Sequence, residues 1–348
     1  LVDVDESRLH IVGDFCERLL HENGIEPRIV QTCDLSRALD GADYIVTQIR
    51  AGRLEARIRD EKIPPGFGLI GQETTGIGGF MNALRTIPQM AAIASAAERY
   101  APEAWMINFS NPSGIVTEYL LNHKPLKSVG LCNLPIGAQE RIARLLGVPM
   151  EQVRLETVSL NHCGAITAVY LNGENVLPRL LSPESLDYAA SQEPWVHYYR
   201  PIIDMLGVIP NDYLQYFFYR ERKLQELMQA PQTRGEACVE IETRLLSYYA
   251  DVRTRTIPPM LAERGGHLYS EAAVALIASL SGAAPGDHVV DVQNKGTLSF
   301  LPENSVIETS CFVDRGSIRR NPVISAPNEA LVSLLTSVKA YETLTVRA

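Results

Sequence analysis

Two side chains that could bind one metal ion lie at the ends of apolar runs in this 348-residue chain. Cys132 is followed by Asn133, and His162 is preceded by Asn161. A thiolate and an imidazole both bind divalent metals, and two protein ligands leave coordination positions open for the hydroxyls of a substrate. Because the chain has no HExxH or CxxC motif, the same residues also fit a buried thiol beside a hydrogen-bonded histidine, with no metal.

A tyrosine in the second half of the chain is a candidate base. Tyr213 begins the segment Tyr213-Leu214-Gln215-Tyr216. A free phenol has a pKa of about 10, so it acts as a base near neutral pH only beside a positive charge. A bound metal could supply that charge. Without one, the segment is typical of an aromatic stripe that packs a helix against a core.

Arginines provide the third kind of candidate chemistry. Arg57 belongs to a basic cluster between residues 50 and 62, and Arg234 precedes a predicted helix. A guanidinium binds phosphate through two hydrogen bonds at once. The alternative interpretation of each arginine is a solvated surface side chain.

Composition excludes several classes of partner. The formal net charge of −9 argues against nucleic acid, whose phosphates require a basic surface. The longest nearly apolar run, residues 272–284, is shorter than the roughly 18 residues of a membrane-spanning helix, so we expect no membrane association. The six cysteines are scattered, which favours free thiols in a reducing cytoplasm.

The elements that would position these residues alternate along the first half of the chain. Continuous apolar runs predict buried strands, and amphipathic segments between them predict helices. The predicted strands are 43–49, 105–109 and 128–131, and the helices that follow them include 82–100, 113–121 and 136–146. This order indicates an α/β fold with a doubly wound, Rossmann-like parallel sheet, in which ligands bind beyond the carboxyl ends of the strands.

The character of the sequence changes after Gly147. The predicted elements are a strand pair over 153–171, an Asn172-Gly173 hairpin turn, long helices over 183–260, strands over 288–313 and a helix over 326–345. We therefore expect a Rossmann-like NAD-binding domain over residues 1–150 and a second, α+β domain over residues 151–348 that binds substrate and metal.

Two segments of the first domain raise further expectations. Asp3 resembles the acid that ends the second strand of a dinucleotide-binding unit and binds ribose hydroxyls, and the alternative interpretation is an ordinary strand-end residue. The glycine-rich turn that should precede it is absent, so we expect a chain truncated at its start. Residues 50–80 are polar and glycine-rich, which predicts a long binding loop.

Taken together, the motifs of this chain resemble those of glycoside hydrolase family 4, the NAD- and metal-dependent glycosidases. The matching stretches are Gly68-Leu69-Ile70-Gly71-Gln72-Glu73-Thr74-Thr75-Gly76, Asn108-Phe109-Ser110-Asn111-Pro112-Ser113-Gly114, Gly130-Leu131-Cys132-Asn133-Leu134-Pro135, Leu160-Asn161-His162, Tyr213-Leu214-Gln215-Tyr216 and Asn294-Lys295-Gly296. The Cys-Asn-Leu-Pro form resembles the 6-phospho-β-glucosidase branch. The C-terminal helical stretch of the family is missing, so we expect truncation at both ends.

The resemblance implies a role for each candidate residue. Cys132 and His162 match metal ligands, usually of manganese, and Tyr213 matches the catalytic base. The remaining matches are binding residues: Arg57 and Arg234 for the 6-phosphate, Asn111 for sugar hydroxyls and Asp3 for the ribose of NAD.

The resemblance also implies a mechanism and a substrate. NAD takes a hydride from C3 of the sugar, Tyr213 removes the C2 proton, the aglycone leaves from C1, water adds and the hydride returns. Unlike glycosidases that use two carboxylates, this mechanism is redox-assisted. The implied substrate is a phosphorylated disaccharide or an aryl β-glucoside 6-phosphate, and we expect a homo-oligomer.

Two other functions remain open from the sequence. A lactate/malate-type dehydrogenase shares the predicted fold but uses a histidine, an aspartate and an arginine with no metal. A sugar-phosphate-binding or NAD-binding protein without catalytic activity is the second alternative.

Overall fold

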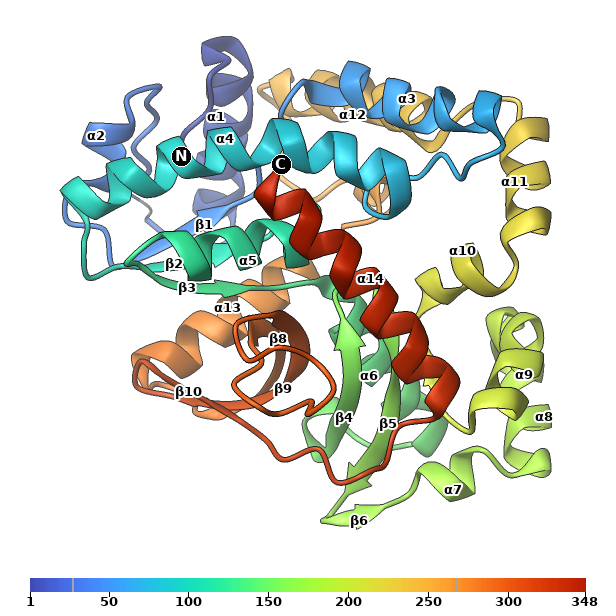
Figure 1. Cartoon of the computed structure of the whole chain (residues 1–348). Coiled ribbons are helices and arrows are strands. Elements are labelled where there is room, and N and C mark those ends of the chain that lie inside the picture. The colour runs from blue at the N-terminus through green and yellow to red at the C-terminus, as the bar shows by residue number, and fades with distance from the viewer. Residues whose placement is uncertain (27, 267) are drawn as a thin grey trace.

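The computed structural model describes residues 1–26, 28–266 and 268–348, and its centre is a six-stranded sheet (Figure 1). The strand order is β1-β2-β3-β8-β9-β10. Their bounds are β1 (Tyr44–Thr47), β2 (Trp105–Asn108), β3 (Lys127–Gly130), β8 (Gly286–Gln293), β9 (Val306–Asp314) and β10 (Ser317–Arg320). The first three strands are parallel, and the register pairs Thr47 with Asn108 and Asn108 with Gly130. Their carboxyl ends therefore form one level edge.

Helices cover both faces of this sheet. On one side Met106 packs with Met90 of α4 (Gly76–Tyr100) and Leu120 of α5 (Ser113–His123). On the other side Ile107 packs with Leu276 of α13 (Tyr269–Ser281). Because neighbouring residues of a strand point to opposite faces, a continuous apolar run buries both of them. The prediction of a doubly wound sheet is confirmed.

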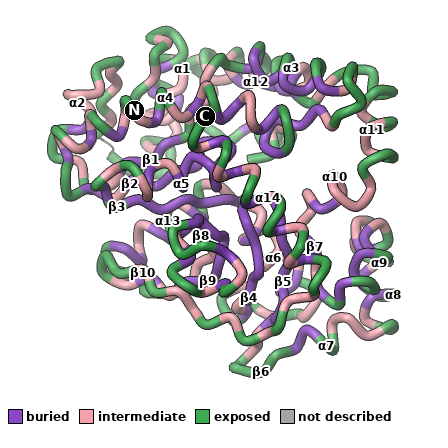
Figure 2. Tube along the Cα trace, in the orientation of Figure 1, coloured by how far each residue is buried: buried purple, intermediate pink, exposed green. Residues whose placement is uncertain are grey.

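A second sheet stands beside the first. It contains β4 (Val153–Leu160), β5 (Cys163–Leu171) and β6 (Glu174–Asn175), and β7 (Ile209–Pro210) pairs with β5. The predicted hairpin at Asn172-Gly173 is confirmed: both residues have positive φ, 52° and 84°, as a type I′ turn requires. Figure 2 shows that β4 and β5 are buried along most of their length.

The remaining helices surround the two sheets. They are α1 (Glu6–Glu22), α2 (Leu35–Leu39), α3 (Arg53–Lys62), α6 (Asn133–Leu146), α7 (Leu177–Leu180), α8 (Pro183–Gln192), α9 (Pro194–Leu206), α10 (Gln215–Phe218), α11 (Arg220–Gln229), α12 (Arg234–Ala250) and α14 (Glu329–Arg347). Short 3-10 helices are η1 (Pro64–Phe67), η2 (Met150–Gln152), η3 (Asp212–Leu214) and η4 (Pro259–Arg264). In Figure 1, α3 lies along α12, and α14 runs from the second sheet to α4.

The prediction of one long loop over residues 50–80 is wrong. This segment contains α3, η1 and the first turns of α4, and only residues 68–75 connect them without a helix. Gly52 precedes α3 and has a φ of 79°, a conformation that favours glycine. The start of the helix therefore accounts for this glycine, and no ligand-binding role is needed. Several of the polar residues behind the loop signal are in fact buried in contacts between helices: Arg57 and Glu61 of α3 contact α12, and Asp60 pairs with Arg85 of α4.

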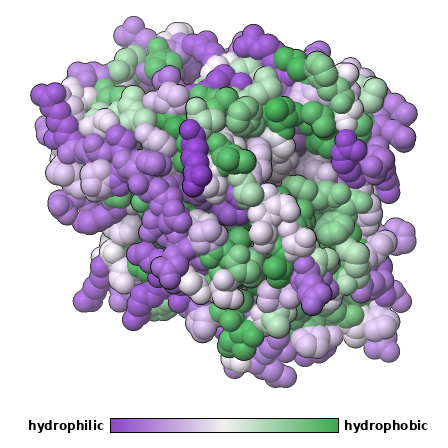
Figure 3. Space-filling model, in the orientation of Figure 1, coloured by the Kyte–Doolittle hydropathy of each residue, from purple (hydrophilic) through white to green (hydrophobic). Residues whose placement is uncertain are grey.

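The domain boundary near residue 150 stays a prediction. Strands β8, β9 and β10 follow that boundary in the sequence and yet extend the sheet of β1 to β3 through the pairing of Gly130 with Asp291. Both halves of the chain thus contribute to one sheet. Hydrophilic and hydrophobic side chains are interspersed over the face in Figure 3. Across the described ranges, no helix is both long enough and apolar enough to cross a membrane.

Candidate active site

Cys132 and His162 converge where the two sheets meet. Cys132 lies two residues beyond the end of β3 and is the N-cap of α6. His162 is the second residue of the two-residue turn between β4 and β5 and has a φ of 62°. Both side chains are buried, and Cys132 Sγ lies 3.4 Å from His162 Nε2. The two candidate ligands are thus close together although β3 and β4 belong to different sheets, and their metal role stays a prediction.

This geometry fits a shared metal ion. Sulfur and nitrogen donors at about 2.3 and 2.0 Å from one metal lie about 3 to 3.6 Å from each other when the angle at the metal is near 90° to 110°. The observed 3.4 Å falls in that range. Within the described ranges no group of three or more histidine, cysteine, aspartate or glutamate side chains is arranged for a metal. A metal held here would therefore have two protein ligands and room for substrate oxygens.

Burial sets the protonation of both candidate ligands. It lowers the pKa of His162 to about 4, so the imidazole is neutral and can donate a lone pair. Burial, followed by the charge of Glu308, raises the pKa of the Cys132 thiol above its usual value. Metal binding would therefore have to displace the thiol proton.

Tyr213 stacks directly on the imidazole. The two ring centroids are 4.2 Å apart and the rings are 6° from parallel. Tyr213 lies in η3, where its backbone N–H donates to Asn211 Oδ1 at 2.9 Å. Burial is the largest effect that raises the pKa of the Tyr213 phenol above its usual range, and a hydrogen bond with Thr74 only partly opposes the rise. The phenol is therefore neutral unless a positive charge lies beside it.

Arg57 is buried and forms ion pairs with two carboxylates. It is 8% exposed on α3, and its Nε donates to Glu61 Oε1 at 2.7 Å. Its Nη1 is 2.9 Å from Glu73 Oε1, and Glu73 also pairs with Arg50. The second oxygen of Glu61 accepts from the backbone N–H of Gly235 at 2.7 Å. Arg57 is thus connected through Glu61 to the first turn of α12.

Arg234, the residue before Gly235, is exposed by contrast. It is the first residue of α12, whose N-cap Thr233 forms a capping box with Glu236. Its Nη2 donates to the backbone oxygen of Glu263 at 2.7 Å. Of the two predicted phosphate ligands, Arg234 has the solvent-facing guanidinium.

The other two predicted binding residues lie at different distances from the site. Asn111 follows β2 at the level strand edge, is half-buried, and accepts from the backbone N–H of Ser113 at 3.4 Å. Asp3 lies next to Val2, which forms a parallel bridge with Thr32, and its Oδ1 accepts from the Asp5 N–H at 3.0 Å. Its contacts place Asp3 outside the group of Cys132, His162 and Tyr213.

Sequence reasoning assigned no role to several residues that the structure places at the site. Glu73 is close enough to Tyr213 and His162 to affect the pKa of both. Asp291 and Glu308 lie behind the turns that carry the ligands. The available signal was an acidic residue inside the segment predicted as strands over 288–313, at 291 and again at 308.

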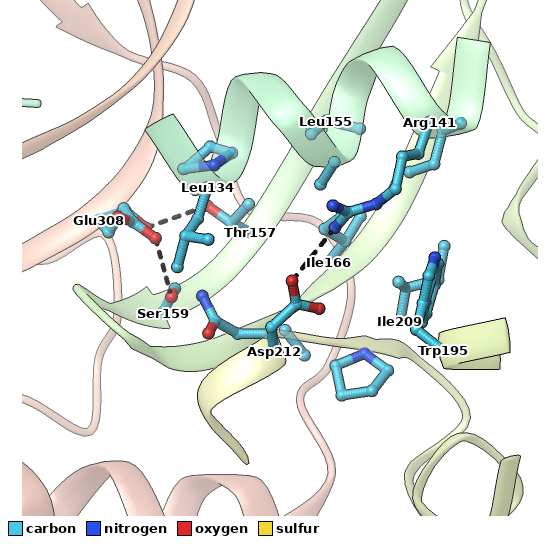
Figure 4. Close-up of a pocket in the computed structure, with 16 residues that line it drawn as sticks. Leu134, Arg141, Leu155, Thr157, Ser159, Ile166, Trp195, Ile209, Asp212 and Glu308 are labelled. Atoms are coloured by element: carbon cyan, nitrogen blue, oxygen red, sulfur yellow. Dashed lines mark hydrogen bonds and ion pairs between the residues drawn. The ribbon is translucent and has the colours of Figure 1, made fainter. Parts of the chain in front are cut away.

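A pocket extends behind the site between α6 and η3 (Figure 4). Asp212 and Arg141 face each other across it with 3.5 Å between Oδ2 and Nη2, and Glu308 lies at the opposite end near Ser159. Most of the remaining lining is apolar, including Leu134. Residues of β4 and β5, the strands joined by the turn that carries His162, thus form one wall of this pocket.

Comparison with known proteins matches both halves of the chain. The model of family 4 glycosyl hydrolases matches residues 1–148, and the model of the family 4 C-terminal domain matches residues 158–348. A probable 6-phospho-beta-glucosidase of Bacillus subtilis (strain 168) is 35% identical over 363 residues, which cover 100% of this chain and 80% of that protein.

Solved structures agree with this match. The 6-phospho-beta glucosidase from Thermotoga maritima with manganese, NAD+ and glucose-6-phosphate has a TM-score of 0.90 at 32% identity and covers 100% of this chain and 81% of that one. Malate dehydrogenase from Plasmodium falciparum, at 13% identity, a TM-score of 0.57 and coverage of 100% of this chain and 88% of that one, shares the fold alone. The chain therefore belongs to family 4 of the glycosyl hydrolases.

Proposed function

We propose that this protein hydrolyses 6-phospho-β-glucosides with NAD and a divalent metal, manganese, as cofactors. The observation that carries the proposal is the stack of Tyr213 on His162, whose Nε2 lies 3.4 Å from Cys132 Sγ. It puts a phenol directly beside two metal-ligating atoms. Three relatives that are 35%, 31% and 35% identical over 98% or more of this chain carry the name 6-phospho-beta-glucosidase, which supports the phosphorylated β-glucoside as substrate.

The residues of the site divide the work of a redox-assisted elimination. When bound, NAD supplies a hydride acceptor for C3 of the sugar and the metal supplies Lewis-acid polarisation of the oxygen there. Cys132 and His162 would hold the metal. Tyr213 would remove the proton from C2, after which the aglycone leaves from C1 and water adds there. Because burial raises the pKa of Tyr213, this role requires the positive charge of the bound cation.

Three further groups would position the reactants. Arg57 and Arg234 would hold the 6-phosphate, Asn111 would bind sugar hydroxyls, and Asp3 would accept hydrogen bonds from the ribose of NAD. The carboxyl ends of parallel strands are where such a fold places its ligands, and Asn111 and Cys132 both lie there.

We also propose a cytoplasmic homo-oligomer that binds no nucleic acid. All six cysteines are free thiols, as a reducing compartment allows. The net charge of −9 disfavours binding to the negatively charged phosphate backbone of a nucleic acid. Light scattering at several protein concentrations measures the oligomeric state, and a monomer throughout would contradict that part.

The direct test is hydrolysis of p-nitrophenyl 6-phospho-β-glucoside after removal of NAD and metal. Release of p-nitrophenol should require both NAD and Mn²⁺. The plain β-glucoside and the 6-phospho-α-glucoside serve as controls and should react far more slowly. Hydrolysis that is undiminished by a chelator and by removal of NAD would contradict the proposed function, and equal rates on all three substrates would contradict the proposed substrate.

A further inference from the structure

Two buried acids face each other beneath the site. Asp291 on β8 and Glu308 on β9 are cross-strand partners in register, so both side chains point to the same face of the sheet. They are 1% and 3% exposed. Like charges directly opposite each other destabilise a sheet, and burial raises the pKa of both carboxyls. Such a costly pair calls for a role that apolar side chains could not fill.

Glu308 holds the hairpin that carries His162. Its Oε1 accepts from Asn161 Nδ2 at 2.9 Å, and its Oε2 accepts from Ser159 Oγ at 3.3 Å. The Asn161 side chain also hydrogen-bonds to the thiol of Cys132. The side-chain amide of Asn161, the residue before His162, therefore connects Glu308 to Cys132.

The left-handed backbone of His162 makes this anchor important. A φ of 62° is uncommon for a residue with a side chain, and the surroundings must hold it there. The imidazole Nδ1 is buried and has no hydrogen-bond partner among the described residues. Ring orientation therefore depends on the stack with Tyr213, on the contact between Nε2 and Cys132 Sγ and on the turn, not on a hydrogen bond at Nδ1.

Asp291 holds the other side of the site in the same way. Its Oδ2 accepts from Ser113 Oγ at 2.7 Å, two residues after Asn111. A Cβ on Gly130, two residues before Cys132, would lie 2.6 Å from the same oxygen. The carboxylate thus packs against the strand end that leads to Cys132. The two anchored segments also touch, because a Cβ on Gly114 would lie 3.1 Å from Asn161 Cβ.

We propose that Asp291 and Glu308 are positioning residues that fix the relative placement of Cys132, His162 and Asn111 for metal and sugar. Neither acid is a metal ligand in this proposal; each acts through the hydrogen bonds of a turn. The inference rests on the proposed function, since it assigns these acids to the same metal site. Groups that hold metal ligands in place typically change metal affinity or activity by about 10- to 100-fold when removed.

The test compares two substitutions of Glu308 that differ in hydrogen bonding. Glu308→Met keeps the approximate volume and deletes the acceptor, whereas Glu308→Gln keeps an acceptor for Asn161. Mn²⁺ affinity, measured by the electron paramagnetic resonance signal of free Mn²⁺, reports on the site without any turnover. Glu308→Met should weaken Mn²⁺ binding about 10- to 100-fold, and Glu308→Gln should restore most of it.

Glu156→Met is the matched control. Glu156 is a strand glutamate with 2% exposure that accepts from the backbone N–H groups of Ile324 and Ser325, both at 3.0 Å. Its loss should lower the unfolding temperature and leave Mn²⁺ affinity unchanged. If Glu308→Met does not fold, Asn161→Ala breaks the same hydrogen bond from the donor side and should weaken binding similarly.

The outcomes separate this inference from the function on which it rests. Wild-type Mn²⁺ affinity in folded Glu308→Met, or in folded Asn161→Ala, would overturn the positioning role while the proposed function stands. An equal loss in Glu156→Met would also overturn it, because the effect would then be general destabilisation. A wild-type protein that binds no Mn²⁺ would end both proposals together.

Discussion

The contact between Tyr213 and His162 is the most informative feature at the scale of single residues. Stacking of two nearly parallel rings at 4.2 Å ties the candidate base to a candidate metal ligand. Burial alone raises the pKa of the phenol, so Tyr213 is a poor base without a nearby cation. The stack on His162 would place the phenol close to a cation held by that imidazole, and such a charge would lower the pKa of the phenol again.

Tyr213→Phe tests this role, because it deletes the phenol oxygen and keeps the ring that stacks on His162. A positioned general base contributes about 10²- to 10⁴-fold, so kcat should fall on that scale. Mn²⁺ and NAD affinities should not change. Wild-type turnover in D₂O should place deuterium at C2 of the product. Product without deuterium, together with a fully active Tyr213→Phe, would rule out proton removal at C2.

The two arginines should respond differently to removal. Arg234 is exposed and contacts a backbone oxygen, so Arg234→Ala should reduce kcat/KM for the phosphorylated glucoside and leave stability intact. The loss of one charged partner of a phosphate is expected to cost about 2–5 kcal/mol. Arg57→Ala should reduce stability as well, because Glu61 then loses its buried cation and Glu73 loses one of its two arginine partners, keeping Arg50.

The measurement is the ratio of kcat/KM for the phosphorylated and plain glucosides, combined with unfolding by denaturant. Equal losses on both substrates in Arg234→Ala would show that Arg234 does not recognise the phosphate. Wild-type stability of Arg57→Ala would contradict the structural part of the prediction.

At the scale of elements, a buried ion cluster joins α5, β9 and α14. Lys339 of α14 is 2% exposed, and its Nζ lies 2.7 Å from Glu118 Oε2 and 2.5 Å from Glu342 Oε2. It also donates to the backbone oxygen of Val306 at 2.8 Å. Glu118 accepts from the Val306 N–H as well. This cluster holds α14 against the strand that carries Glu308.

Lys339→Met should therefore destabilise the fold strongly. It leaves Glu118 and Glu342 buried without a cation, and breaking a buried pair in this way costs about 3–5 kcal/mol. Denaturant unfolding measures the loss. The double variant with Glu118→Gln is the control and should recover part of the stability, because one unpaired carboxylate is then removed. A loss below about 1 kcal/mol would show that the cluster contributes only as a surface pair does.

Sequence reasoning succeeded where an element is set by its own residues. The strand predicted at 105–109 is observed as Trp105–Asn108, because a continuous apolar run can be buried only between two layers. It failed for α3, where Arg57, Asp60 and Glu61 are buried in ion pairs and no apolar stripe marks the helix. Strand-end positions made Cys132 and His162 candidates to meet if their strands were neighbours, whereas the structure brings them together from two different sheets, and their metal role stays a prediction.

The position of Asp291 directly opposite Glu308 could not be predicted from the sequence. It arises from the register of β8 and β9 and from the position of β8 beside β3. Such placements depend on contacts between residues far apart in the sequence, which no local pattern contains. The two acids were visible as charged residues within predicted strands, and only the fold shows which turns they hold.

At the scale of the whole molecule, the six-stranded sheet is shared by both halves of the chain, and the site lies where this sheet meets the second one. The same architecture occurs in a dehydrogenase, so the fold alone does not decide between net oxidation and hydrolysis. The difference lies in whether the hydride returns to the sugar within each cycle.

This difference predicts how NAD behaves during turnover. A small amount of NAD should support the release of many equivalents of aglycone, and the absorbance of NADH should stay low throughout, because each cycle regenerates the oxidised cofactor. A chelator should stop aglycone release, because it would remove the metal held by Cys132 and His162. Added Mn²⁺ should bind there again and restore the release. Cys132→Ser provides the matched control and should resist restoration by Mn²⁺. Accumulation of one NADH for each substrate consumed would instead identify a dehydrogenase, and aglycone release that persists in chelator would exclude the metal from the reaction.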